Sequence, residues 1–217
     1  MSPQSAKVNP ERWPPYDFDQ INKGVERTRL AIQYVMAKID AFKLLDESLV
    51  PEGLKQIARS MSWLIEQIVV QNIRKHKDAC GITSVDNPPH GLAQYDCVLH
   101  FKDDPQEYLV NIKTSLSITQ TGGKSDISKG PKLVELYESN PNAVLIVAIV
   151  KVTLEGVVVT FDDLILFNVA WTPDPYYNRA NHNLQSICNG TQTRRTNQEF
   201  VEILRGLMKA AGHDMHY

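Results

Sequence analysis

The hydrophobic pattern of the first part of the chain predicts two long helices. Apolar residues recur at three- and four-residue steps in residues 17–48 and again in residues 51–76, which places them on one face of each helix. Asp17 or Asp19 can cap the first helix, and the Val50–Pro51 step separates the two. The apolar face of the second helix is broader, so we expect this helix to pack on a β-sheet.

The pattern then changes to the two-residue alternation of β-strands. Residues 95–101 and 108–114 are rich in aromatic and branched apolar residues, and the polar tract between them contains Pro105, which predicts a hairpin. Residues 143–152, AVLIVAIVKV, are almost entirely apolar, as in a central strand that is covered on both faces. Residues 156–161 fit a hairpin partner of that strand, and residues 164–169 fit a further short strand or a helical turn.

The remaining segments are more polar. Gly, Asn and Pro residues predict a loop over residues 78–94. Ser125 or Asp126 can cap a helix that runs to about Ser139. A terminal amphipathic helix is expected from Asn197 to Ala211.

Composition limits the classes of protein that fit. The 217 residues are 42% hydrophobic and 22% charged, as in a globular domain, and no apolar run approaches the length needed to span a bilayer. The first residues lack the apolar core of a signal peptide, so we expect a cytoplasmic protein without membrane attachment. Three cysteines without Cys/His spacing argue against a zinc site or a disulfide framework. A net charge of −2 argues against a protein that coats DNA, but it is compatible with a cleft of local positive charge.

Candidate chemistry lies in the predicted hairpin. Alternation places Asn111 and Lys113 on one face of the second strand, and antiparallel pairing brings Asp96 of the first strand close to Lys113. A carboxylate, an amide oxygen and an ammonium group then meet at one end of the sheet. Mg²⁺ prefers oxygen ligands with one or two carboxylates, and a lysine can stabilise developing charge, so this set suits phosphodiester hydrolysis.

The same residues resemble a known motif. Asp96, fourteen intervening residues and then Asn111–Ile112–Lys113 resemble the PD-(D/E)XK nuclease motif, and the continuation through Thr114–Ser115 and Gly122–Asp126 is similar to type II restriction endonucleases. The resemblance covers roughly residues 63–190. It implies an α/β fold with a restriction-endonuclease-like core, in which a mixed β-sheet is flanked by α-helices. The single domain then divides into an N-terminal arm (1–16), a helical part (17–76), a catalytic sheet core (94–169), a DNA-recognition segment (170–196) and a C-terminal helix (197–217).

The resemblance also implies roles for individual residues. Asp96 and position 111 would bind Mg²⁺, and Lys113 would orient or activate the attacking water. The family has Asp or Glu where this chain has Asn111, and an amide is a weaker ligand for a hard cation than a carboxylate. The chain is then an inactivated variant that traps DNA, a protein in which Glu66 of the preceding helix has taken over the acidic role, or a protein that binds DNA without cutting it. We favour the first interpretation.

Two polar segments are candidates for contacts with double-stranded DNA. Asn and Gln can pair with adenine and Arg with guanine in the major groove, and hydroxyl groups bind phosphate. The candidates are Ser115, Ser117, Thr119, Gln120 and Lys124 after the motif, and Asn178, Arg179, Asn181, Asn183, Gln185, Arg194 and Arg195 in the recognition segment.

The expected function is Mg²⁺-dependent, sequence-specific double-strand cleavage by a homodimer, with a methyltransferase protecting the same site. Three alternatives stay open. They are a DNA-binding protein with a degenerate nuclease core, a repair or junction-resolving nuclease, and an interaction domain that works through its two long helices.

Overall fold

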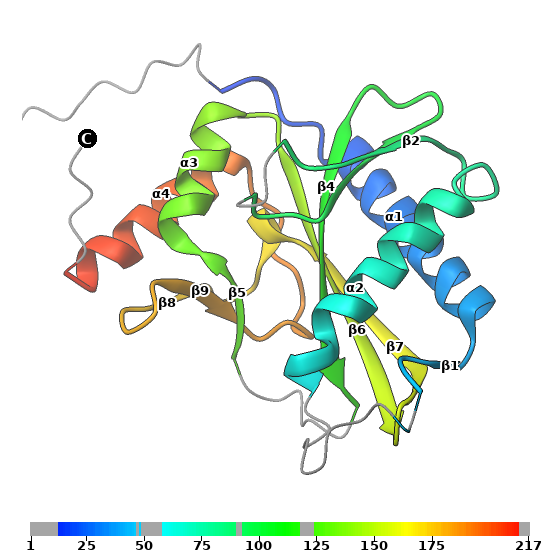
Figure 1. Ribbon diagram of the computed structural model, residues 1–217. Helices are drawn as coiled ribbons and strands as arrows, with labels where there is room; N and C mark the ends of the chain where they lie inside the picture. Colours follow the sequence, from blue (N-terminus) through cyan, green and yellow to red (C-terminus); the bar gives the residue numbers. More distant parts are fainter. Residues whose placement is uncertain (1–12, 47, 49–57, 90–92, 118–123, 213–217) are drawn as a thin grey trace, which may run out of the picture.

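The computed structural model describes residues 13–46, 48, 58–89, 93–117 and 124–212, and these form a mixed α/β fold (Figure 1). Its helices are α1 (Phe18–Ile39), α2 (Ala58–Lys75), α3 (Gly130–Ser139), the short η3 (Val169–Trp171) and α4 (Asn197–Ala210). Its strands are β1 (Phe42–Lys43), β2 (Ile82–Asp86), β3 (Cys97–Phe101), β4 (Glu107–Leu116), β5 (Ser125–Lys129), β6 (Val144–Glu155), β7 (Val158–Asn168), β8 (Tyr176–Asn178) and β9 (Asn183–Ser186).

The main sheet has the strand order β1-β7-β6-β4-β3-β2. Strands β2, β3 and β4 are antiparallel neighbours, β4 is parallel to β6 after the crossover through α3, and β6 forms a hairpin with β7. The expected hairpin of residues 95–101 and 108–114 is confirmed, with Cys97 opposite Val110. The apolar run of residues 143–152 is confirmed as a central strand, because β6 lies between β4 and β7.

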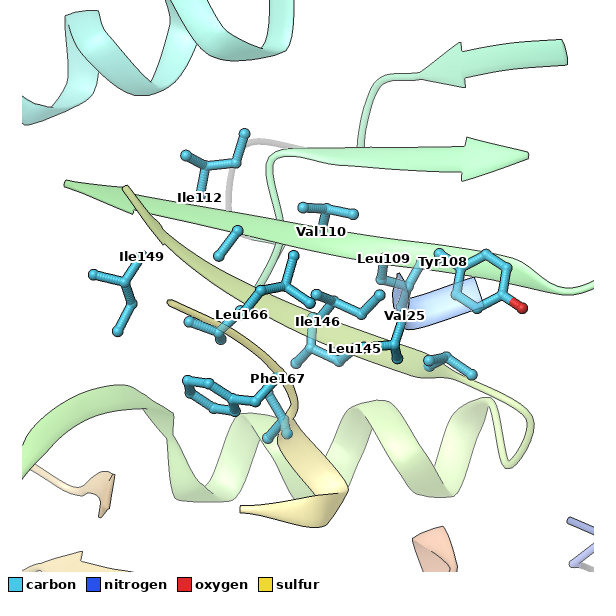
Figure 2. Close-up of a cluster of buried hydrophobic side chains, with 14 of the residues drawn as sticks. Val25, Tyr108, Leu109, Val110, Ile112, Leu145, Ile146, Ile149, Leu166 and Phe167 are labelled. Atoms are coloured by element: carbon cyan, nitrogen blue, oxygen red, sulfur yellow. The ribbon is translucent and has the colours of Figure 1, made fainter. Parts of the chain in front are cut away.

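Helices cover both faces of this sheet. Helices α1 and α2 contact each other and the strands β4 and β7, and α3 pairs with α4 on the other side of the sheet (Figure 1). Side chains from β4, β6 and β7 fill the space between the layers, among them Val110, Ile112, Ile146 and Phe167 (Figure 2). Within the part of the chain that the structure describes, no helix is long and apolar enough to cross a bilayer.

The first helix is shorter than expected. The Asp17 carboxylate accepts hydrogen bonds from the backbone N–H groups of Asp19 and Gln20, which confirms the expected cap. The helix ends at Ile39 because Asp40 adopts a positive φ of 54°, and Phe42–Lys43 then pairs with β7. The expectation of a helix to residue 48 was therefore wrong beyond Ile39.

Three other boundaries also differ from expectation. The loop expected at residues 78–94 contains β2, and residues 164–169 mostly continue β7 as one long strand. Ser125 and Asp126 do not cap a helix, because they belong to β5, which pairs with β9 far along the chain. Helix α3 starts only at Gly130. The C-terminal helix is confirmed, and a capping box between Thr196 and Glu199 fixes its start.

Helix α1 and strand β4 approach each other closely at Gly24. A Cβ atom at this position would lie only 1.9 Å from Cζ of Tyr108, a fully buried ring. The ring is fixed in place, because its hydroxyl donates a hydrogen bond to Asp104 Oδ2 at 2.9 Å. The helix therefore needs glycine here in spite of the low helix propensity of this residue.

We predict opposite effects for the same substitution at two helical glycines. Gly24→Ala should lower the free energy of unfolding by about 1–3 kcal/mol, because the methyl group overpacks against Tyr108. Gly206→Ala in α4 faces open space and should raise it by about 0.5–1 kcal/mol. Urea unfolding of both variants measures the two values. A Gly24→Ala protein as stable as the unmodified chain would contradict the close packing.

Candidate functional site

The candidate site lies where β3 ends and β4 continues. The last ladder contact before this point is the hydrogen bond from the Asp96 backbone N–H to the Val110 carbonyl, at 2.8 Å. Strand β4 runs on to Leu116 with β6 along its other edge. Among the described residues, no strand pairs with β4 on the β3 side beyond this point. The N–H groups of Ile112 and Thr114 point to this open side, since they alternate with those of β4 that face β6.

Two carboxylates take the place of the missing strand. The Ile112 N–H donates to Asp96 Oδ2 at 2.7 Å, and the Thr114 N–H donates to Glu66 Oε1 at 3.2 Å. The Thr114 hydroxyl also donates to the carbonyl of Ser62, which fixes α2 against β4. Lys113 lies between the two hydrogen-bonded residues. The structure therefore brings together three sequence candidates, Glu66, Asp96 and Lys113.

Burial raises the pKa of both acids. Burial raises the pKa of Glu66, the negative charge of Asp96 raises it further, and the hydrogen bonds from Thr114 and the charge of Lys113 lower it in part. Burial also raises the pKa of Asp96, against the hydrogen bond from Ile112 and the charge of Lys113. Each acid thus carries a desolvation cost that a nearby cation would reduce.

Asn111 lies on the same strand face as Lys113, and its amide group has a defined orientation. Its Nδ2 donates to the Gln94 carbonyl at 2.8 Å, so Oδ1 is the atom left to bind a cation or water. The described residues contain no group of three or more His, Cys, Asp or Glu side chains that could hold a metal. Two carboxylates and an amide oxygen nevertheless fit Mg²⁺, which takes few protein carboxylates and completes its shell with water and phosphate.

Residues that were not candidates from the sequence also border the site. Gln94 accepts a hydrogen bond from the Ser128 hydroxyl, which connects β5 to the segment before Asp96. Cys188 lies near Ser125 and Lys113. Burial raises the pKa of its thiol, whereas the hydrogen bond with Ser125 and the charge of Lys113 lower it. No local signal marks these residues, because the long-range pairing of β5 with β9 brings them here.

The candidate amides of residues 178–185 belong to the small β5-β9-β8 sheet, with Asn178, Asn183 and Gln185 on one face of its strands and Asn181 in the turn between β8 and β9. Tyr176, Gln185 and Asp126 form one cross-strand row, and Asn178 and Asn183 belong to the next row on the same face, together with Lys129. The ammonium group of Lys124 lies 4.0 Å from the centre of the Tyr176 ring.

Asp126 holds three of these amides. Its Oδ2 accepts hydrogen bonds from Asn183 Nδ2 at 2.7 Å and Asn181 Nδ2 at 3.2 Å, and its Oδ1 accepts one from Gln185 Nε2 at 2.5 Å. Asn178 makes a local hydrogen bond, in which its Oδ1 accepts from the Ala180 N–H. The amide side chains are thus fixed before any ligand binds.

The other candidates are spread more widely. Arg195 forms hydrogen bonds within the protein, because its Nη1 donates to the backbone carbonyls of Ala170 at 3.1 Å and Thr172 at 2.7 Å. Arg194 is exposed and lies 3.5 Å from Asp19. Arg179 is exposed, Ser115 is half-buried on β4, and the Ser117 hydroxyl donates to Asp162. Thr119 and Gln120 lie outside the described residues.

No model of a known protein family matches this chain, and no curated protein matches it significantly. The case for a function therefore depends on the geometry of the site.

We predict that Glu66 destabilises the protein at neutral pH. An unfolded glutamate titrates near pH 4.5, and the folded value is higher. Below pH 4.5 the Glu66 carboxyl group is protonated in both the folded and the unfolded state, so its burial costs no stability. The free energy of unfolding falls as the pH rises through the folded pKa, because the buried carboxyl group must then ionise. Glu66→Gln keeps the Oε1 acceptor for Thr114 and should be more stable than the unmodified chain at pH 7.5 in EDTA.

The increase in the free energy of unfolding caused by Glu66→Gln should shrink as the pH falls toward 4.5. Urea unfolding at pH 7.5 and pH 4.5 measures it. The control is Glu155→Gln at the exposed end of β6, where a surface substitution changes stability by no more than about 0.5 kcal/mol. A Glu66→Gln protein that is less stable at both pH values would contradict the buried ionised carboxylate.

Proposed function

We propose that this protein is a Mg²⁺-dependent nuclease that makes sequence-specific double-strand cuts in DNA, with a core like that of type II restriction endonucleases. One observation carries the proposal. The Asp96 and Glu66 carboxylates bind the backbone on either side of Lys113, at the open edge of β4. The charge of Lys113 acts on both carboxylates, so two acids and one ammonium group lie together where we propose that a phosphate approaches.

The side chains divide the work of phosphodiester hydrolysis. Asp96 and the Asn111 Oδ1 are the groups that would hold the cation, with Glu66 as a further acid beside them. When bound, Mg²⁺ supplies positive charge that polarises a phosphoryl oxygen and lowers the pKa of water. Lys113 orients the attacking water and offsets the negative charge that develops on the phosphate. The hydrogen bonds from Ile112 and Thr114 keep both carboxylates in place, which lowers the entropic cost of reaching the reactive geometry.

The small sheet supports recognition of DNA bases. Each amide NH₂ has two hydrogens, and Asp126 uses one from each of Asn183 and Gln185. The second hydrogen and the carbonyl oxygen of each amide remain for a bidentate pair with adenine in the major groove. Lys124, Arg179 and Arg194 are exposed cations that can bind phosphate. The proposal includes a homodimer that matches a palindromic site, and a methyltransferase that protects that site.

A second candidate function is DNA binding without cleavage. Asn111 favours it, because a neutral amide holds a hard cation less strongly than a carboxylate. The two functions differ in what restoring the carboxylate does.

We predict that Asn111→Asp converts the protein into an efficient nuclease. Supercoiled plasmid incubated with this variant and Mg²⁺ should give discrete bands, at a rate about 10²-fold or more above that of the unmodified chain. Adding Lys113→Ala should lower the rate by about 10²–10³-fold, the usual cost of losing one charge-stabilising group, and leave DNA binding largely intact. The matched control is Lys102→Ala, an exposed lysine in the turn between β3 and β4.

The products distinguish the candidates. Uncut plasmid together with a sequence-selective gel shift indicates binding without cleavage. Uncut plasmid and no gel shift argue against any function on DNA.

We also predict that Mg²⁺ stabilises the protein through Asp96. With a dissociation constant of roughly 1 mM, 10 mM Mg²⁺ adds about 1.4 kcal/mol to the free energy of unfolding, or about 3–5 °C in Tm. Asp96→Asn keeps an oxygen acceptor for the Ile112 N–H and should abolish the shift. Asp78→Asn, at a side chain that is 86% exposed, should retain it. Thermal unfolding in Mg²⁺ and in EDTA measures the difference, and equal shifts in both variants rule out a cation at Asp96.

A further inference from the structure

Trp63 is the most exposed large hydrophobic residue in the described part of the chain, with 69% of its surface accessible. The other two tryptophans are placed differently, since Trp171 is only 2% exposed and Trp13 packs against the core. Exposing an indole has a free-energy cost because a large apolar surface stays in contact with water. A ligand that covers Trp63 would remove that cost.

The indole lies beside the candidate site. Trp63 is one helical turn before Glu66 on α2, and the preceding residue, Ser62, accepts the hydrogen bond from the Thr114 hydroxyl. At 100° per residue, Trp63 is about 60° around the helix axis from Glu66. The indole therefore lies within one helical turn of a carboxylate of the candidate site.

The rest of this helix face indicates which ligand fits. Trp63, Gln67, Gln71 and Arg74 follow one another at steps of three and four residues, on the side of α2 away from the buried Ile65. The row extends over roughly 16 Å and contains a single apolar side chain. In this row one aromatic ring is followed by two amides and by Arg74, whose Nη2 also donates to Asn87 Oδ1 at 2.8 Å. An exposed ring beside donors that can bind phosphate is the combination with which proteins bind nucleic-acid bases.

We propose that Trp63 stacks on a DNA base next to the scissile phosphate and opens the adjoining base step. This inference depends on the proposed function and adds a requirement to it, namely that the substrate is a duplex deformed at the cut. Stacking on an indole compensates for the lost base stacking. Base steps that unstack easily, such as TA and CA, are then favoured at this position without any base-edge contact.

Tryptophan fluorescence tests the contact directly. The probe is a duplex selected by gel shift from a randomised pool, with Ca²⁺ in place of Mg²⁺. Subtracting the spectrum of Trp63→Phe from that of the unmodified chain isolates the emission of Trp63, and DNA should quench it. Trp63→Ala should weaken binding by about 10-fold or more, and Trp63→Phe should largely retain affinity because a ring still stacks. Leu30→Ala, at a side chain that is 64% exposed on α1, should bind like the unmodified chain.

The alternative outcomes are distinct. Unchanged affinity of Trp63→Ala with no quenching overturns the stacking contact and leaves the proposed function in place. A gel shift that is absent from every protein, including the unmodified chain, overturns both. If Trp63 emission changes with protein concentration in the absence of DNA, and Trp63→Ala sediments as a smaller species, the residue is a contact between two copies and the stacking proposal is wrong.

Discussion

The structure depends on one constraint, which is the unequal length of β3 and β4. Strand β4 continues past Asp96 without its partner, and its N–H groups at residues 112 and 114 still need acceptors, because an unpaired buried N–H group costs as much as a lost hydrogen bond. Carboxylates satisfy them. The same contacts that complete the edge of the sheet also fix two acids beside Lys113, so the architecture of the sheet and the chemistry of the site have one cause.

This arrangement has a cost in stability. Burial raises the pKa of both Glu66 and Asp96, so each acid destabilises the fold at neutral pH when it is ionised. Lys113 offsets only part of this cost. A structural role alone would be served by a neutral acceptor such as glutamine, which could bind the Thr114 N–H without a desolvated charge. Two half-buried carboxylates at one strand edge are therefore consistent with the cation of the proposed function.

Alternation and a short turn predicted the hairpin and the approach of Asp96 to Lys113, because both are determined within one short stretch of the chain. The unbroken apolar run of residues 143–152 predicted the central strand. The sequence could not show the pairing of Asp126 with Gln185, which are 59 residues apart. Propensity instead suggested a helix cap at Asp126, and the small sheet overrode it. Sequence also cannot separate Arg194, which is exposed, from the adjacent Arg195, which binds backbone carbonyls inside the protein.

The formal charge of the site depends on whether position 111 is asparagine or aspartate. Counted by formal charge, Glu66, Asp96 and Lys113 together carry −1, and Mg²⁺ would bring the site to +1. Aspartate at position 111 would reduce this to neutral while holding the cation more firmly. Under the proposed function, the amide would therefore leave more positive charge to attract the DNA backbone but would hold the cation less firmly than a carboxylate. Under the proposed function, asparagine at position 111 therefore suits the binding of DNA better than its cleavage, whether the amide is native or replaced an aspartate.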